Sequence, residues 1–186
     1  MLEIRARAGN DNFSLLKTPP LLPSEVLVRV ARLARIDGNG ILILSGAVAL
    51  ANASNHDVLG AALGLAVAAG GAAEIHGVGL LSQGEKKGGG WLVASQLYLL
   101  VLLVGYSVWG LTHTDLSAYK AVLTDEVKAQ IAEMGYSVDD FLILIDRVKY
   151  GALAGGTLLY QGGMALYYHR RRPALEAAID ADLAGE

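Results

Sequence analysis

The segment from Trp91 to Leu111 most constrains the fold, because it contains 21 residues and no charged side chain. A helix that crosses the hydrocarbon layer of a bilayer needs about 20 predominantly apolar residues. Trp91 and Trp109 lie near the two ends of the segment, where tryptophan favours the membrane–water interface. The sequence therefore predicts a membrane-spanning helix over residues 91–111.

A second segment, 58–81, is also long enough to span a bilayer, and its ionisable side chains are Glu74 and His76. Two further spans are predicted over about 39–54 and 141–168. The first of these is short, so a full span and a re-entrant segment both stay open. The chain is 53% hydrophobic and 18% charged, against about 25% charged in soluble domains. We predict an all-α integral membrane protein, a four-helix transmembrane bundle over 38–168.

Residues 1–37 are predicted to form a cytoplasmic arm that ends in a basic amphipathic helix, for which Ser24 can act as the N-cap. Three basic side chains fall on one arc of this helix, opposite an apolar arc: Arg29, Arg32 and Arg35. This pattern is typical of a helix at an anionic membrane surface, although packing on the protein's own cytoplasmic face is an alternative. The segment Asp37–Gly40 has turn composition and is predicted to end the helix.

Lysine and arginine are distributed unequally along the chain. Eleven of the 15 lie in the N-terminal region, the loop 82–90 and the tail 169–186. The positive-inside rule places that side in the cytoplasm, and four spans are required for this alternation. The connector 112–140, with a short helix over 124–134, then lies outside. We expect a multi-pass protein of the cell or inner membrane with both termini cytoplasmic.

Polar side chains at membrane depth carry most of the functional information, because they cost free energy unless they are partnered or hydrated. Counted from the predicted cytoplasmic ends, Glu74 and Gln161 lie about 10 Å deep, and His76 and Gln96 about 7–8 Å deep. These four form a predicted intramembrane polar layer. It either binds or relays a proton or small cation, or it supplies interhelical hydrogen bonds. His76 lies about 200° around the helix from Glu74, so one helix face does not hold both.

Glycine spacing predicts where helices pack closely. One helix carries Gly60 and Gly64, and another carries Gly151 and Gly155 with Gly162 on the same stripe. Small residues four apart let helix backbones approach each other in a membrane. The partner helix belongs either to the same chain or to another copy.

Several kinds of chemistry have no signature in this chain. There is no cysteine, which excludes disulfides, thiolate metal sites and thiol nucleophiles. Phosphate-binding glycine loops, Gly-x-Ser-x-Gly elbows and His-Glu-x-x-His zinc motifs are missing from the sequence. We therefore expect no catalytic residue, metal ion, cofactor or nucleic-acid partner, and no enzyme activity.

Two functions stay open on these grounds. The first is a structural or accessory membrane module that packs through its glycine faces against copies of itself or a membrane partner. The alternative is a proton or small-cation channel or transporter subunit that uses the polar layer around Glu74. Expected partners are the lipid bilayer, anionic lipid headgroups and further copies of the chain. The two functions differ in whether Glu74 faces a hydrated cavity or a dry helix contact.

Overall fold

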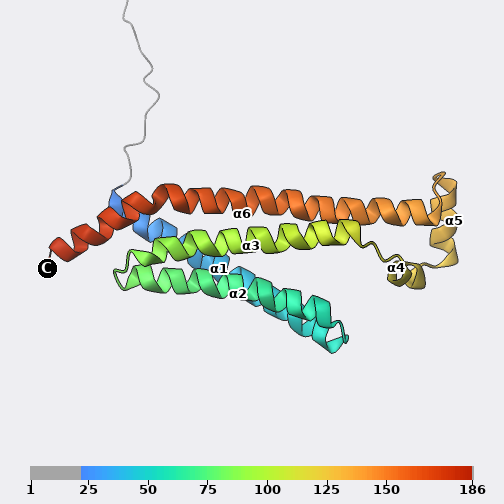
Figure 1. Ribbon diagram of the computed structural model, residues 1–186, viewed down its shortest axis with the longest axis horizontal. Coiled ribbons are helices and arrows are strands. Elements are labelled where there is room, and N and C mark those ends of the chain that lie inside the picture. Colours follow the sequence, from blue (N-terminus) through green and yellow to red (C-terminus); the bar gives the residue numbers. More distant parts are fainter. Residues whose placement is uncertain (1–21, 186) are drawn as a thin grey trace, which may run out of the picture.

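The computed structural model describes residues 22–185, and within them the chain is helical without strands. The first 21 residues, which include most of the predicted cytoplasmic arm, lie outside the described residues. The all-α prediction is confirmed. Figure 1 shows the helices in order: α1 Pro23–Ser54, α2 Val58–Ser82, α3 Lys87–Thr112, α4 Ser117–Val122, α5 Asp125–Glu133 and α6 Val138–Ala184.

Three helices, α1, α2 and α3, are long and apolar enough to cross a membrane. At a rise of 1.5 Å per residue, α2 and α3 are about 37–39 Å long, which covers the hydrocarbon layer. The outward faces of the three helices expose large apolar side chains, such as Leu50 of α1 and Val101 of α3, which are 72% and 71% exposed. Apolar surface of this extent is stable in an apolar solvent. The structure thus indicates an integral membrane protein.

Helix α1 corrects the prediction that Asp37–Gly40 ends the first helix, because α1 continues unbroken from Pro23 to Ser54. Gly38 is buried, and a Cβ built on it would lie 3.0 Å from the carbonyl oxygen of Gly71 in α2. A glycine inside a helix costs about 1 kcal/mol of helix propensity, but tertiary packing overrides this cost. The predicted amphipathic helix and the first apolar segment are therefore one continuous helix.

The start of α3 differs from the sequence prediction in the same way. The glycines Gly88–Gly90 were expected in a loop, yet α3 begins at Lys87 and contains them. A Cβ on Gly88 would lie 2.5 Å from the carbonyl oxygen of Gly77 in α2. The glycines are helical because they allow α2 and α3 to pack closely just beyond their connecting turn.

Helix α6 has 47 residues and passes through Pro173, although the predicted span ended at 168 and the tail was treated as a separate segment. The extension is stabilised by burial of Leu175 and Ile179 in one apolar cluster with Val26 and Val30 of α1. Tertiary packing at this end therefore holds the helix together across a proline that lacks a backbone donor.

The connector between α3 and α6 contains the short helix that the sequence predicted. Thr124 caps α5 by accepting a hydrogen bond from the backbone N–H of Val127, and Gly135 takes a positive φ of 82° after it. Ser137 caps α6 by accepting from the backbone N–H of Asp140. Both caps form because short side-chain acceptors satisfy N–H groups that have no partner in the first helical turn.

The helices pack as two antiparallel pairs, α1 with α2 and α3 with α6, joined along α2 and α3. Figure 1 shows the pairs close together near the C-terminus and diverging toward the α1–α2 turn. The main apolar core lies at the joined end: Val26, Val30, Ala34, Val78, Leu81, Leu92, Tyr168, Leu175 and Ile179. The pairs therefore form a wedge that is open at one end.

Substitution of Gly71 by alanine should destabilise the α1–α2 contact. The added Cβ would lie 2.6 Å from the carbonyl oxygen of Gly38 and 2.8 Å from the backbone nitrogen of Leu42. Backbone atoms cannot rotate away, so the expected loss is about 1–3 kcal/mol of unfolding free energy. Reversible unfolding in mixed detergent measures it. Gly79→Ala is the matched control, because no atom of the described chain lies within 4 Å of its built Cβ; equal losses in both variants would contradict the prediction.

Candidate functional site

Polar side chains from all four long helices meet on the inner side of the wedge. Asp37 comes from α1, Glu74 from α2 and Gln96 from α3, and α6 contributes three more. We call this set the polar cluster: Asp37, Glu74, Gln96, Tyr160, Gln161 and Tyr168. Each pair of helices places a carboxyl or an amide against the other pair.

Glu74 is fully buried, with an exposed fraction of 0%. The hydroxyl of Tyr168, also fully buried, donates a hydrogen bond to its Oε1 at 2.6 Å. The Cβ of Glu74 lies 3.3 Å from the position of a Cβ built on Gly38, which places the carboxyl at the contact with α1. Glu74 therefore faces the protein interior, because its side of α2 carries the buried glycines Gly70, Gly71 and Gly77.

The second carboxyl of the cluster, Asp37, belongs to α1. The hydroxyl of Tyr160 donates to Asp37 Oδ1 at 2.7 Å, and the amide Nε2 of Gln96 donates to Oδ2 at 3.3 Å. Gln96 is fully buried, and its amide connects α3 to Asp37 of α1. Asp37 itself is half-buried and lines a cavity.

The two carboxyls form a pair without a basic partner. Asp37 precedes Gly38, whose built Cβ would lie 3.3 Å from the Cβ of Glu74, so the two carboxyls come from positions where α1 and α2 pack against each other. None of the salt bridges found between residues 22 and 185 involves either carboxyl. Two adjacent negative charges in a weakly polar environment repel strongly. A proton or a cation bound at the pair removes that repulsion.

Three buried oxygen atoms of the cluster have no hydrogen-bond partner among the described residues: Glu74 Oε2, Gln96 Oε1 and Gln161 Oε1. Buried acceptors are normally paired, so such groups are places where a proton, ion or water can bind. Carboxylate and amide oxygens are also the ligands that hard cations prefer. The cluster can therefore accept a proton or coordinate a small cation.

The structure brings together three of the four residues of the predicted polar layer: Glu74, Gln96 and Gln161. The fourth, His76, is exposed and packs edge-on against Trp91, with ring centroids 5.0 Å apart. Its separation of about 200° around α2 from Glu74 places it on the outer face. The prediction that His76 belongs to the layer is therefore not supported by the geometry.

Sequence reasoning missed Asp37, Tyr160 and Tyr168. Asp37 was assigned to a turn, although the buried stripe Val26, Val30, Ala34 and Gly38 continues at every fourth residue past it. Tyr168 lies seven residues after Gln161 and therefore on the same face of α6. Both periodicities are readable in the sequence and indicate Asp37 and Tyr168.

Comparison with known proteins adds nothing to this geometry. No protein family, characterised protein or solved structure matches the chain. We therefore infer function from the polar cluster and the surfaces around it.

The two predicted glycine faces differ in their surroundings. A Cβ on Gly64 would lie 2.9 Å from Cα of Ala49 in α1, and one on Gly60 would lie 2.5 Å from the side-chain Nδ2 of Asn52. On α6, in contrast, no atom of the described chain lies within 4 Å of a Cβ built on Gly151, Gly155 or Gly162. The α2 glycines therefore pack within the chain, whereas the α6 glycines form an open stripe.

The arginine arc of α1 faces outward. Arg29, Arg32 and Arg35 are exposed, while Val26 and Val30 on the opposite face are buried in the core. The apolar face of this segment thus packs on the protein. The basic face stays accessible to anionic headgroups.

A second polar group lies near the start of α6. Asp146 is buried and forms a salt bridge of 2.7 Å with Lys149, and side chains three residues apart lie on the same face of a helix. The hydroxyl of Tyr119 in α4 donates to Asp146 at 3.2 Å, which ties the connector to α6. These contacts are satisfied, so we assign them a structural role. Within the described part of the chain, no three histidine, aspartate or glutamate side chains are grouped to hold a metal ion.

Proposed function

We propose that this chain is a small membrane protein that takes up and passes a proton or small cation at the Asp37–Glu74 carboxyl pair. The observation that carries the proposal is the meeting of these two carboxyls with partners that, within residues 22–185, are all neutral. Gln96, Tyr160 and Tyr168 donate hydrogen bonds to the pair but supply no positive charge.

The excess of acceptors argues against a purely structural role. Interhelical hydrogen bonds that serve as glue pair each donor with an acceptor, because an unpaired buried group costs about 1–3 kcal/mol. Here three oxygen atoms on three helices lack a donor in the described chain. A bound proton or cation supplies the missing positive partner.

A second candidate function is an accessory module that packs against a copy of itself or a membrane partner. The open stripe of Gly151, Gly155 and Gly162 on α6 favours it, because small residues permit close contact with a helix from another chain. Both functions are compatible with one molecule, since the stripe and the polar cluster lie on different faces of α6.

We further propose that α6 is a fourth span. It packs along α3, one of the three apolar helices, and lies beside it in Figure 1. Its outer face exposes large apolar side chains over the same stretch: Leu144, Ile145, Val148, Leu158, Leu159 and Leu166. A helix that accompanies a spanning helix along its length crosses the same layer.

The proposed orientation places the joined end of the wedge at the cytoplasmic surface. Eight of the 12 lysines and arginines in residues 22–185 then lie on that side, as the positive-inside rule requires. Arg29, Arg32 and Arg35 reach the anionic headgroups of the inner leaflet, where each basic side chain contributes about 1 kcal/mol of attraction.

Vesicle flotation tests this contact with lipid. The full chain with these three arginines changed to glutamine should lose its preference for anionic over neutral vesicles, and an unchanged preference would exclude the contact.

Single cysteines introduced at Ser82 and Ser117 should react with a membrane-impermeant maleimide from opposite sides of the membrane. The chain contains no cysteine, so each variant carries one label site. Ser82 lies at the end of α2 and Ser117 at the start of α4, across the proposed third span. Labelling is compared in intact cells and in inverted vesicles. Labelling of both positions from the same side would refute the four-span arrangement.

Flux in proteoliposomes tests the proposed function directly. Vesicles with an internal pH dye and an imposed membrane potential should acidify faster with the wild-type chain than without it if protons pass. Parallel vesicles with sodium- or potassium-sensitive dyes separate small cations from protons. Wild-type vesicles that show no flux above empty ones for any of these ions would exclude the proposal and leave the accessory module.

A further inference from the structure

A groove runs from the polar cluster along the inner side of the wedge. Its inner part is a cavity of about 400 Å³ between α1, α2, α3 and α6, with Asp37, Tyr160 and Gln161 in its lining. Its outer part, about 350 Å³, extends to Asn52 and Asp57 at the α1–α2 turn. Both parts share the lining residues Leu44, Ser45 and Val67, so they adjoin each other, and together we call them the groove.

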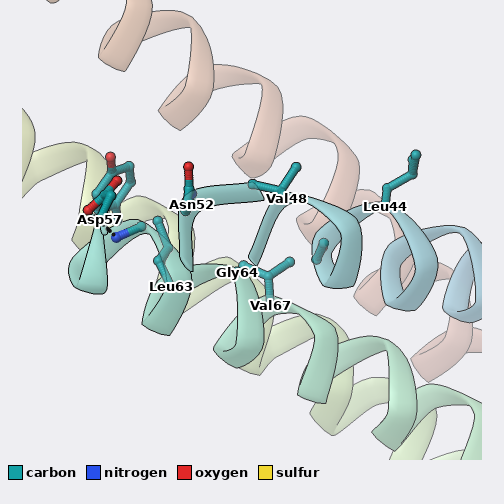
Figure 2. Close-up of a pocket in the computed structure, with 10 residues that line it drawn as sticks. Leu44, Val48, Asn52, Asp57, Leu63, Gly64 and Val67 are labelled. Atoms are coloured by element: carbon teal, nitrogen blue, oxygen red, sulfur yellow. Dashed lines mark hydrogen bonds between the residues drawn. The ribbon is translucent and has the colours of Figure 1, made fainter. Parts of the chain in front are cut away.

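Figure 2 shows the outer part of the groove, where apolar side chains of α1 and α2 form the wall: Leu44, Val48, Leu63 and Val67. In the inner part, Leu99 and Leu103 of α3 continue that wall to the acidic end. The groove therefore has a mainly apolar wall between a polar outer end at Asn52 and Asp57 and an acidic inner end at Asp37. Among the residues that the structure describes, no lysine or arginine lines either cavity.

The acidic end of the groove has an unused acceptor in addition to Asp37. Gln161 is 94% buried, lines the inner cavity, and has no hydrogen-bond partner for its Oε1 in the described chain. The ring of Tyr160 lines the same end, and aromatic faces attract organic cations. The volume of each part of the groove falls in the range of about 300–1,000 Å³ that is usual for small-molecule sites.

We propose that this groove binds an amphiphilic organic cation, whose apolar body lies between the two helix pairs and whose charged group meets Asp37, Tyr160 and Gln161. The inference rests on the proposed function, because it names a substrate class for the same carboxyl pair. A lipid acyl chain would fill the apolar wall equally well but would leave the acid and the amide oxygen without a partner. Charge complementarity therefore selects a cation over a neutral chain.

Binding of tetraphenylphosphonium to the purified full-length chain in a non-ionic detergent tests the inference, measured by equilibrium dialysis against detergent alone. We expect saturable binding that Asp37→Asn weakens by roughly tenfold or more. Val67→Trp should also weaken it, because the larger side chain fills the groove. Val101→Trp is the matched control, since Val101 is 71% exposed on α3 and lines neither cavity. Triphenylphosphine oxide, a neutral analogue, should bind much more weakly to the wild type.

The outcomes separate this inference from the proposed function. Ion flux without tetraphenylphosphonium binding would overturn the inference and leave the transport of small ions. Binding that is insensitive to Asp37→Asn and Val67→Trp, or equal binding of the neutral analogue, would also overturn it and identify an acyl-chain groove. Binding that requires Asp37 and an open groove, without flux of small ions, would support the inference and exclude small-ion transport.

Discussion

Glu74→Gln and Asp37→Asn should each reduce ion flux in proteoliposomes by roughly tenfold or more. Each change removes one negative charge and keeps the shape of the side chain. The loss of a charge-assisted contact costs about 1.5–3 kcal/mol, and 1.4 kcal/mol corresponds to a factor of ten. The measurement is the initial rate with the dye-loaded vesicles described above, at equal protein content.

Folding should survive the same two substitutions. Replacing a buried charge by a neutral amide removes an electrostatic cost, so the unfolding free energy of Glu74→Gln should hold or rise. Glu133→Gln is the matched control, because this carboxyl is exposed on α5 and lies outside the polar cluster. Flux that stays at the wild-type rate in both cluster variants would show that the carboxyl pair does not carry the ion.

Tyr168→Ala should lower the unfolding free energy by about 3–5 kcal/mol, the usual cost of truncating a large buried aromatic side chain. Tyr168 is fully buried in the core at the joined end of the wedge and donates to Glu74. Tyr168→Phe keeps the ring and removes the hydroxyl, so its expected loss is about 1.5–3 kcal/mol. Reversible unfolding in mixed detergent measures both.

A double-mutant cycle then assigns the smaller loss to the hydrogen bond. In a Glu74→Leu background the carboxyl is gone, so Tyr168→Phe should cost much less than in the wild type. An equal cost in both backgrounds would show that the hydroxyl of Tyr168 does not stabilise the protein through Glu74. Tyr167→Phe serves as the control, because this neighbouring tyrosine makes no hydrogen bond to Glu74 in the described structure.

The helical class and the approximate limits of α2 and α3 could be predicted from the sequence. Membrane spans are encoded by long local runs of apolar residues, and such runs need no knowledge of the tertiary structure. The caps at Thr124 and Ser137 are local in the same sense, since each side chain bonds a backbone group three residues away. The Asp146–Lys149 pair also follows from spacing along one helix.

The continuity of α1 and α6 could not be predicted in this way. Asp37–Gly40 and Pro173 are local signals for a helix end, and both were overridden by packing against distant residues. Gly38 packs against Gly71, and the segment after Pro173 packs against Val26 and Val30. Local propensity amounts to about 1 kcal/mol at a glycine and about 3 kcal/mol at a proline, which a well-packed interface can exceed.

Polar groups at one depth on three helices can be expected from the sequence, because depth depends only on the count of residues from each predicted end. Which of these groups meet depends on the tertiary structure. It brought Asp37 to Glu74 by keeping α1 helical, left His76 on the outer face, and opened the groove by splaying α1 and α2 from α3 and α6. The physical reason is that rotation and spacing of helices are set by contacts between residues far apart in the chain, such as the glycine contacts of α1 with α2, which no local pattern specifies.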